Sequence, residues 1–247
     1  MKRGFLQFLY EMRPYISSHS SNQHSSGDLL LTTSLRDYTR ILDLGCGKGC
    51  GIDLHSLMQK NPGITIFLVG LDISDINQNS LLELVLYDGN RIPFKDASFD
   101  IVYCNQVLEH VRYPDAVIAE VARIIKSDGF FIGSVSHTEP YHAYSIFNWT
   151  PYGLVQVFSS AGFKSIRVFS GIDSMTLLLR RISLGRFGNY FFSHESLFNI
   201  VISGIGKILR FSHPKMNALK LLFCGQFSFC AKKNSLSKER SGEVFIK

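Results

Sequence analysis

The feature of this sequence that most constrains its fold is the segment Ile-Leu-Asp-Leu-Gly-Cys-Gly-Lys-Gly at residues 41–49, in which an apolar run leads into glycines at alternate positions. Glycine adopts the backbone angles of a tight turn without strain and lets backbone amides approach a ligand closely. The apolar run predicts a strand over residues 40–44, and the residues after the glycines predict a helix over residues 52–60. A strand that turns through glycines into a helix favours a ligand site at the carboxyl end of that strand.

Short apolar runs and helical patterns continue to alternate along the chain. Further strands are predicted at residues 64–71, 84–87, 99–104, 130–135, 164–169 and 223–231, and further helices at residues 114–126 and 150–161. This alternation favours a doubly wound α/β fold, with a mostly parallel seven-stranded sheet and helices on both faces. In such a sheet the ligand sits beyond the carboxyl ends of the strands, where the strand order reverses.

The length and composition suit one domain with appendages. The chain has 247 residues, and its hydrophobic fraction of 45% is too high for a disordered protein. We expect an N-terminal helix and a serine-rich loop over residues 1–28, a main domain over residues 29–233 and a polar tail over residues 234–247. Residues 171–222 depart from the alternation and are predicted to form a helical insertion before the last strand.

Cysteine spacing and hydropathy exclude several classes of protein. The five cysteines include no Cys-x-x-Cys pair of the kind found in zinc or redox sites, which indicates reduced thiols rather than a disulfide scaffold. No segment reaches the roughly eighteen unbroken apolar residues that a membrane span needs. The chain starts with Met-Lys-Arg, but Gln7 interrupts its apolar stretch and Glu11 ends it, so we expect no secretion signal and a cytoplasmic protein.

Asp43 indicates which ligand the glycine turn binds, because it lies two positions before the first glycine. A dinucleotide site must hold a pyrophosphate, which a carboxylate at this position would repel. S-adenosylmethionine instead carries an ammonium and a sulfonium group, so a negative side chain here favours S-adenosylmethionine. The alternative is that Asp43 caps the turn without any ligand.

Two further acids follow the next two predicted strands. Asp72, which precedes Ile73, lies 23 residues beyond Gly49, near the spacing at which an acid reaches ribose hydroxyls. A carboxylate accepts two hydroxyl hydrogen bonds, which suits a vicinal diol. Asp88, which precedes Gly89, is expected to accept a hydrogen bond from an adenine amino group, and a plain Asp-Gly turn is the alternative.

The order of these motifs resembles the class I S-adenosylmethionine-dependent methyltransferases. The resemblance rests on the acid and glycine loop at residues 43–49, on Asp72, on Asp-x-x-x-x-Pro-Phe at residues 88–94, on Ser-Phe-Asp at residues 98–100 and on Leu-Glu-His at residues 108–110. It runs from about residue 40 to residue 169, over half of the chain. It implies a Rossmann-like fold and S-adenosylmethionine as the cofactor.

The resemblance also implies roles for individual residues. Asp43 and the glycine loop would hold the methionine part of the cofactor, and Asn105 and Gln106 would lie against its sulfonium end. Asp72 would hold the ribose and Asp88 the adenine. Only 15 residues separate these two acids, so the helix between the second and third strands must be very short. The full set of residues expected to bind the cofactor is Asp43, Gly45, Cys46, Gly47, Gly49, Asp72, Ile73, Asp88, Gly89, Asn105 and Gln106.

The segment after the fifth predicted strand, residues 134–142, lies where a methyl acceptor should enter. A general base is needed there only if the acceptor arrives protonated, as a sugar hydroxyl does. His137 is the best candidate for this base and His142 the next, and the alternative is that either histidine only hydrogen-bonds a loop. A metal site of His137, Glu139 and His142 lacks a recognisable spacing, so no metal is expected. His110 is assigned to packing, as the resemblance implies.

Two segments indicate different acceptors. Residues 140–154, which are rich in aromatic side chains, are similar to a stretch in family members encoded with surface-polysaccharide genes, which favours a small-molecule or glycan hydroxyl. Residues 198–211 mix apolar residues with Lys207 and Arg210, a pattern consistent with a helix lying on a membrane, with a lid, or with a helix packed on its own domain. A membrane helix or lid would suit a lipid-linked or quinone-like acceptor.

The charge distribution bears on partners. The net charge is +6, and residues 174–238 contain ten basic residues and one acid, Glu195. This asymmetry favours an anionic partner, namely a nucleotide-linked substrate, RNA or a membrane face, or else a solvated basic face. No nucleic-acid-binding motif supports RNA, so a nucleic acid is not the expected partner.

The leading hypothesis for the function of the chain is an O-methyltransferase. A dinucleotide oxidoreductase is disfavoured by Asp43, a non-catalytic scaffold that binds the cofactor is the third hypothesis, and no oligomeric state is predicted.

Overall fold

The computed structural model describes residues 2–18, 20–47, 52–74, 83–139, 144–184, 189–192 and 194–233. Within them the chain forms a seven-stranded sheet in the order β3-β2-β1-β4-β5-β7-β6. The strands are β1 (Thr39–Leu44), β2 (Ile66–Asp72), β3 (Glu83–Leu86), β4 (Phe99–Asn105), β5 (Ile125–Ser136), β6 (Phe163–Ser170) and β7 (Gln226–Lys233). Neighbouring strands are parallel except that β7 runs antiparallel to both β5 and β6. The predicted α/β fold with a mostly parallel sheet is therefore confirmed.

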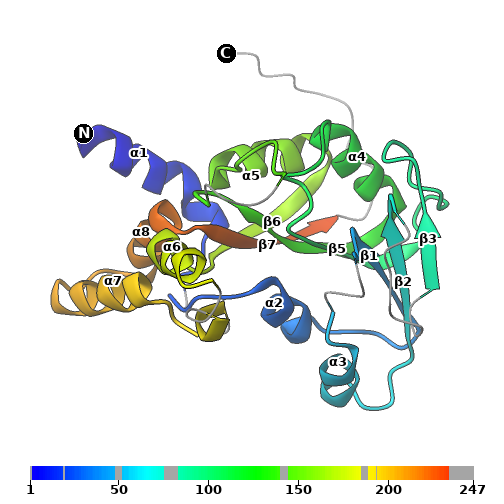
Figure 1. Ribbon diagram of the computed structural model, residues 1–247, viewed down its shortest axis with the longest axis horizontal. Coiled ribbons are helices and arrows are strands. Elements are labelled where there is room, and N and C mark those ends of the chain that lie inside the picture. The colour runs from blue at the N-terminus through cyan, green and yellow to red at the C-terminus, as the bar shows by residue number, and fades with distance from the viewer. Residues whose placement is uncertain are drawn as a thin grey trace.

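Helices cover both faces of this sheet (Figure 1). They are α1 (Lys2–Met12), α2 (Ser26–Thr32), α3 (Leu54–Lys60), α4 (Pro114–Ile124), α5 (Pro151–Ser160), α6 (Ser174–Ile182), α7 (Leu197–Ile208) and α8 (His213–Phe223), with short 3-10 helices at Arg13–Tyr15 and Asn189–Phe192. One apolar core joins the sheet to α4, α5, α8 and the end of α1, and a second joins it to α2 and α3. Successive strand residues point to opposite faces, so Ile41 belongs to the second core and Leu42 to the first.

Helix α4 ends earlier than its sequence pattern predicts. Pro114 occupies its first turn, where the missing amide hydrogen costs nothing, and Ile118 lies on the face that packs against the sheet. The helix stops at Ile124, two residues before the predicted end, because Ile125 already pairs with Phe99 as the first residue of β5. Pairing with β4 thus replaces the last helical turn.

The N-terminal segment differs from the loop that was predicted up to residue 28. Ile16 forms an isolated bridge to Val168 of β6, and α2 starts at Ser26. A capping box starts this helix, in which the Ser25 hydroxyl accepts from the amide of Asp28 while the Asp28 carboxylate accepts from the amide of Ser25. The serine-rich composition concealed this Ser-x-x-Asp signal, so the loop prediction is wrong for residues 26–28.

Helices α6, α7 and α8 lie in the part of the chain for which a helical insertion was predicted, and we call residues 171–222 the helical insertion. Together with α1 they gather at one end of the molecule, on the left in Figure 1. Asp173 starts α6 by accepting a hydrogen bond from the amide of Thr176. Among the helices that the structure describes, none is long and apolar enough to cross a membrane.

Candidate functional site

In the turn after β1, Gly45 and Gly47 both have a positive φ, but only at Gly45 would a side chain clash with its surroundings. Gly45 has a φ of +73° and donates from its amide to the carbonyl of Leu71 at 2.7 Å, and a Cβ atom there would lie 2.4 Å from Cγ2 of Val107. Gly47 has a φ of +58°, and a Cβ atom there would meet nothing within 4 Å. Gly45 is therefore required by packing, whereas Gly47 borders open space at the carboxyl end of β1. The predicted cofactor residue Gly49 lies outside the described residues.

Asp72, at the end of β2, anchors this turn. Its Oδ2 accepts from the amide of Gly47 at 2.9 Å, and its Oδ1 accepts from the amides of Ile73 at 2.7 Å and Ser74 at 3.2 Å. The carboxylate thus joins the loop after β1 to the loop after β2. Oδ1 also accepts from the Ser74 hydroxyl at 3.5 Å, whereas Oδ2 accepts from the Gly47 amide, so Oδ2 keeps an acceptor position for one ribose hydroxyl.

The floor of the turn is buried and negative. Asp43 is 2% exposed and lies opposite Gly70 of β2 and Tyr103 of β4 in the sheet. Burial, and after it the negative charges of Asp43 and Asp72, raise the pKa of the Cys46 thiol to about 11. The thiol therefore stays neutral at physiological pH. The same potential that disfavours a thiolate favours a cationic ligand, which fits the ammonium and sulfonium groups of S-adenosylmethionine.

Asp88 follows β3 on an exposed turn. Hydrogen bonds from the amides of Asn90 and Arg91 to its Oδ1, at 2.9 and 3.1 Å, hold the pKa of this carboxyl below its usual value. Gly89 has a φ of +80°, and a Cβ atom there would lie 3.7 Å from Cγ2 of Ile73, whose side chain is 68% exposed. The exposed isoleucine and the glycine form an apolar edge beside an ionised carboxylate. That arrangement suits a flat aromatic ring with an amino group, as the adenine assignment requires.

A cavity of about 360 Å³ opens beside the carboxyl end of β4, the strand that pairs with β1. Its walls come from the start of α2, the ends of β4 and β5, the strand β7 and the helical insertion. The lining residues are His24, Ser25, Ser26, Gly27, Tyr103, Asn105, Gln106, Ser134, Gly171, Ile172, Phe192, Gln226 and Ser228. No described lining residue carries an ionised carboxylate, ammonium or guanidinium group, so the lining is neutral, with polar groups from serine and amide side chains on a mainly apolar surface. This volume and character are typical of small-molecule sites.

A hydrogen-bonded cluster holds Asn105 at this cavity. Oδ1 of Asn105 accepts from the hydroxyls of Ser26 at 2.9 Å and Ser134 at 2.6 Å, and the Ser26 hydroxyl lies 2.8 Å from the phenol oxygen of Tyr103. The cluster therefore joins α2, β4 and β5 and fixes the Asn105 amide. Both Asn105 and Gln106, which were expected at the sulfonium end of the cofactor, line the cavity.

The side chain of Gln106 is held by the end of β5 and by Glu109. It has a φ of +57°, and its amide satisfies its partners when its nitrogen donates to the Ser136 hydroxyl and to Oε1 of Glu109. Glu109 is fully buried and also accepts from the amide and the hydroxyl of Ser136. The Leu-Glu-His segment thus supplies a carboxylate that braces the end of β5 below the cavity.

His24 is a candidate site residue that the sequence analysis missed. Its amide donates to the carbonyl of Ser170 at 3.0 Å, its carbonyl accepts from the hydroxyl of Ser228 at 3.0 Å, and its ring makes an edge contact with Phe169. It carries the one imidazole among the described lining residues. No sequence signal indicated it, because it sits in a serine-rich segment far from every motif and reaches the cavity only through tertiary contacts.

Of the two histidines predicted as bases, the structure describes only His137. Nδ1 of His137 lies 2.7 Å from the carbonyl oxygen of Trp149, and its ring is not among the residues lining the cavity. Burial lowers the pKa of His137. Its role as a base stays a prediction, and His142 lies outside the described residues. Glu139 pairs with Arg181 at 2.5 Å and accepts from Gln226 at 2.6 Å.

Comparison with known proteins points to one family. A family model described as a methyltransferase domain matches residues 42–133, the region from β1 to β5. A ubiquinone biosynthesis O-methyltransferase of Nitrosomonas europaea is 29% identical over 111 residues, which is 40% of this chain and 45% of that protein. The sterol 4-C-methyltransferase strm-1 of Caenorhabditis elegans is 29% identical over 104 residues, which is 40% of this chain and 31% of that protein.

A solved structure shows the same fold. A phosphoethanolamine N-methyltransferase 2 of Haemonchus contortus, in complex with S-adenosyl-L-methionine, aligns with a TM-score of 0.52 and 15% sequence identity, covering 95% of this chain and 58% of that chain. The chain spans between about a third and a half of the length of these two curated relatives. The helical insertion lies outside the region that the family model matches.

Proposed function

Residues 42–133 are a class I S-adenosylmethionine-dependent methyltransferase domain, and from that premise we propose that the chain transfers a methyl group to a hydroxyl oxygen of a neutral small molecule. The observation that carries the proposal is the neutral cavity at the end of β4, in which serine and amide side chains supply the polar groups. A phosphate, carboxylate or ammonium group entering it would find no countercharge among the described lining residues, and desolvating such a group would be costly. A hydroxyl finds hydrogen-bonding partners there.

Bound S-adenosylmethionine supplies a methyl group that is already activated by a sulfonium leaving group. The residues of the chain then have to align the acceptor, exclude water and remove one proton. Asn105, held by the hydroxyls of Ser26 and Ser134, forms the part of the cavity wall at the end of β4. A hydroxyl acceptor would have to give up its proton to a base of the chain as it is methylated. We assign that base to His24, a residue that lines the cavity.

The acceptor that we favour is a quinol-like or other lipid-borne hydroxyl. Two observations support it. The first is that relatives are named for ubiquinone and sterol methylation. The second is that the helical insertion, which supplies part of the cavity wall, also carries exposed apolar side chains elsewhere on its surface. A glycan hydroxyl is the second candidate. The serine and amide side chains of the cavity favour it, because they provide the donors and acceptors that a polyol uses.

Label transfer separates these candidates. The purified chain is incubated with S-adenosylmethionine carrying a tritiated methyl group and with fractionated cell extract, and the product is then partitioned between an organic and an aqueous phase. We expect the label in the organic phase, whereas label in aqueous glycan fractions would favour the glycan candidate. Incorporation into protein or RNA would overturn the proposal.

Calorimetry tests the premise separately. The intact chain should bind S-adenosylmethionine, and Asp72→Asn should weaken this binding because it removes a charge and one acceptor at the ribose position while keeping the shape of the side chain. Binding without turnover on any fraction would instead support the scaffold hypothesis.

A further inference from the structure

Helix α7 turns its apolar stripe toward solvent, whereas an ordinary surface helix turns this stripe toward the protein core. The exposed side chains on this stripe are between 40% and 82% exposed, and they are Leu197, Ile200, Val201, Ile205 and Ile208. Their spacing of three and four residues places them on one face of the helix. The side that packs against the protein carries Asn199, Ile202 and Gly206. A helix of this composition would ordinarily turn its isoleucines inward.

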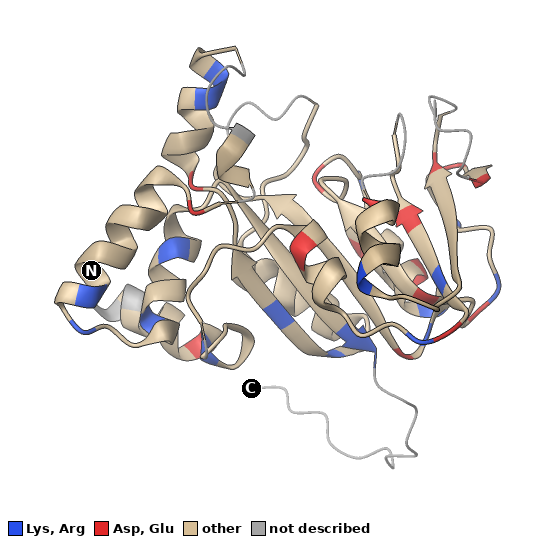
Figure 2. Cartoon of the chain, turned by 90° about the horizontal axis from the view of Figure 1, so that it is seen from below, with Lys and Arg blue, Asp and Glu red and all other residues tan. Residues whose placement is uncertain are grey.

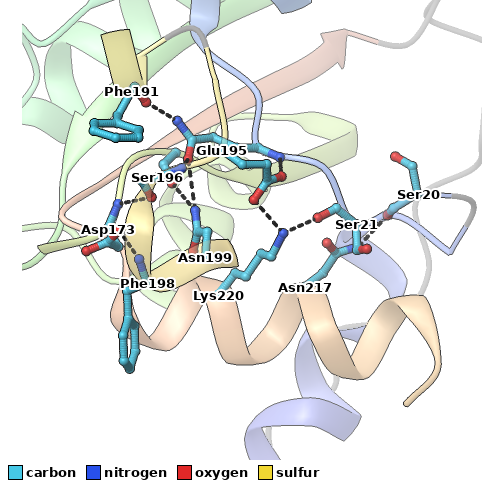
Figure 3. A network of polar contacts seen from close by, with 12 residues as sticks. Ser20, Ser21, Asp173, Phe191, Glu195, Ser196, Phe198, Asn199, Asn217 and Lys220 are labelled. Atoms are coloured by element: carbon cyan, nitrogen blue, oxygen red, sulfur yellow. Dashed lines mark hydrogen bonds and ion pairs between the residues drawn. The ribbon is translucent and has the colours of Figure 1, made fainter. Parts of the chain in front are cut away.

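The polar contacts of the packed side hold α7 in this orientation (Figure 3). Nδ2 of Asn199 donates to Oε1 of Gln23 at 2.9 Å and to the carbonyl of Gly171 at 3.0 Å. Gly206 lies so close to Met216 of α8 that a Cβ atom there would be 2.8 Å from the sulfur. Rolling the helix to bury its isoleucines would break these buried hydrogen bonds and this close approach, so the outward stripe is part of the fold.

The surface around the stripe is basic. Lys207 and Arg210 are exposed at the end of α7, and the one acid between residues 174 and 238, Glu195, is engaged by the buried Lys220 at 2.8 Å. Figure 2 shows most of the acidic residues in the half of the molecule that holds β1–β4, and mainly basic residues around the helical insertion. An apolar stripe bordered by uncompensated positive charge is complementary to a bilayer that contains anionic lipid.

We propose that α7 is a membrane-docking helix that lies in the interface of an anionic bilayer, with its isoleucines in the acyl region and with Lys207 and Arg210 at the phosphates. A helix of 12 residues is about 18 Å long, too short to span the roughly 30 Å hydrocarbon core but long enough to lie within the interface. The docking goes beyond the proposed methyl transfer. It would place the cavity next to the bilayer, because Asn199 of α7 is hydrogen-bonded to Gln23, the neighbour of the lining residue His24.

Vesicle sedimentation tests the docking without any methyl acceptor. The full chain is mixed with vesicles of phosphatidylcholine alone or of equal parts phosphatidylcholine and phosphatidylglycerol. We expect binding to the anionic vesicles, a loss of about tenfold or more in Ile205→Glu/Ile208→Glu, and no loss in Met58→Glu, which places the same change on an exposed apolar position of α3. Removing charge in Lys207→Gln should weaken binding about fivefold, which corresponds to about 1 kcal/mol per basic residue at a membrane surface.

Two results would overturn the docking proposal. One is equal sedimentation of the wild type and the Ile205→Glu/Ile208→Glu variant, and the other is a dimer of the wild type in solution that this variant dissociates, which would make the stripe an interface between two copies. Calorimetric binding of S-adenosylmethionine checks that each variant is folded. Because docking and label transfer are measured separately, failure of one is distinguishable from failure of the other. Should the double variant not fold, Lys207→Gln on anionic vesicles decides the question.

Discussion

The Nζ atom of Lys220 on α8 lies 2.8 Å from Oε2 of Glu195 and 2.6 Å from the carbonyl oxygen of Ser21, with the Lys220 side chain 1% exposed. Oε1 of Glu195 in turn accepts from the amide of Gln23 at 2.6 Å. This ion pair therefore fastens the N-terminal segment to the helical insertion immediately before His24, and the two segments together wall the cavity.

Replacing Lys220 should be strongly destabilising. In Lys220→Met we expect the free energy of unfolding to fall by about 2 kcal/mol, because the change leaves the half-buried Glu195 carboxylate without its countercharge and the Ser21 carbonyl without its donor. Denaturant unfolding measures the effect. The matched control is Lys232→Met, which removes the exposed pair of Lys232 with Asp128 at 2.9 Å and should cost less than about 1 kcal/mol. Equal losses in the two variants would contradict the structural role of the buried pair.

The two glycines of the turn should respond differently to alanine. Gly47→Ala should lower the free energy of unfolding by about 1 kcal/mol through its positive φ and should weaken S-adenosylmethionine binding, because its Cβ atom enters the open space at the turn. Gly45→Ala should cost about 3 kcal/mol, since it adds a clash with Val107 to the same strain. The double variant Gly45→Ala/Val107→Ala should recover part of this loss, and no recovery would show that the clash is not the cause.

His24 should matter for turnover rather than for cofactor affinity. We expect His24→Gln to lower kcat by about a hundredfold, the usual contribution of a general base, while calorimetric binding of S-adenosylmethionine stays unchanged. The comparison variant is His137→Gln. If His137→Gln loses kcat and His24→Gln does not, the base is the residue expected from the sequence.

The unfolding free energy should depend on pH through His137. Burial lowers the pKa of its imidazole in the native state below the value of about 6.5 that it has in the unfolded chain. Below about pH 6.5 the unfolded chain therefore binds a proton that the native chain does not, and stability falls as pH decreases, by at most about 1.4 kcal/mol per pH unit. His137→Gln should flatten this dependence in denaturant titrations between pH 5 and pH 7.5. An unchanged slope would contradict the burial argument.

Cys46 should report the negative potential of the glycine turn. With a pKa of about 11, its alkylation rate followed by peptide mass spectrometry should keep rising with pH well beyond pH 9. Asp43→Asn should move this profile to lower pH, because it removes one of the two charges that raise the pKa. A profile centred near that of a free thiol, about 8.5, would show that the turn is neither buried nor negative.

The sequence by itself determined the strands of this protein's sheet and the glycine turn after β1. Apolar runs located all seven strands, since burial on a sheet is encoded locally, but β5 begins at Ile125, five residues before its predicted start at residue 130. Asp43, Gly45 and Asp72 were recognisable because the chemistry of a turn at a strand end requires particular residue types within a short segment. The errors were local: the capping box at Ser25 was hidden by its serine-rich surroundings, and α4 ended early where β5 began.

Only the tertiary structure decided what surrounds the cavity at the end of β4. His24 reaches the cavity through hydrogen bonds to Ser170 and Ser228, residues far along the chain, and no short-range pattern encodes such contacts. The same holds for α7: its sequence is compatible with either orientation, and the buried contacts of Asn199 with Gln23 and Gly171 turn the isoleucines outward. Periodicity states that a helix has an apolar face, but which way that face points depends on the partners that the fold brings to the other side.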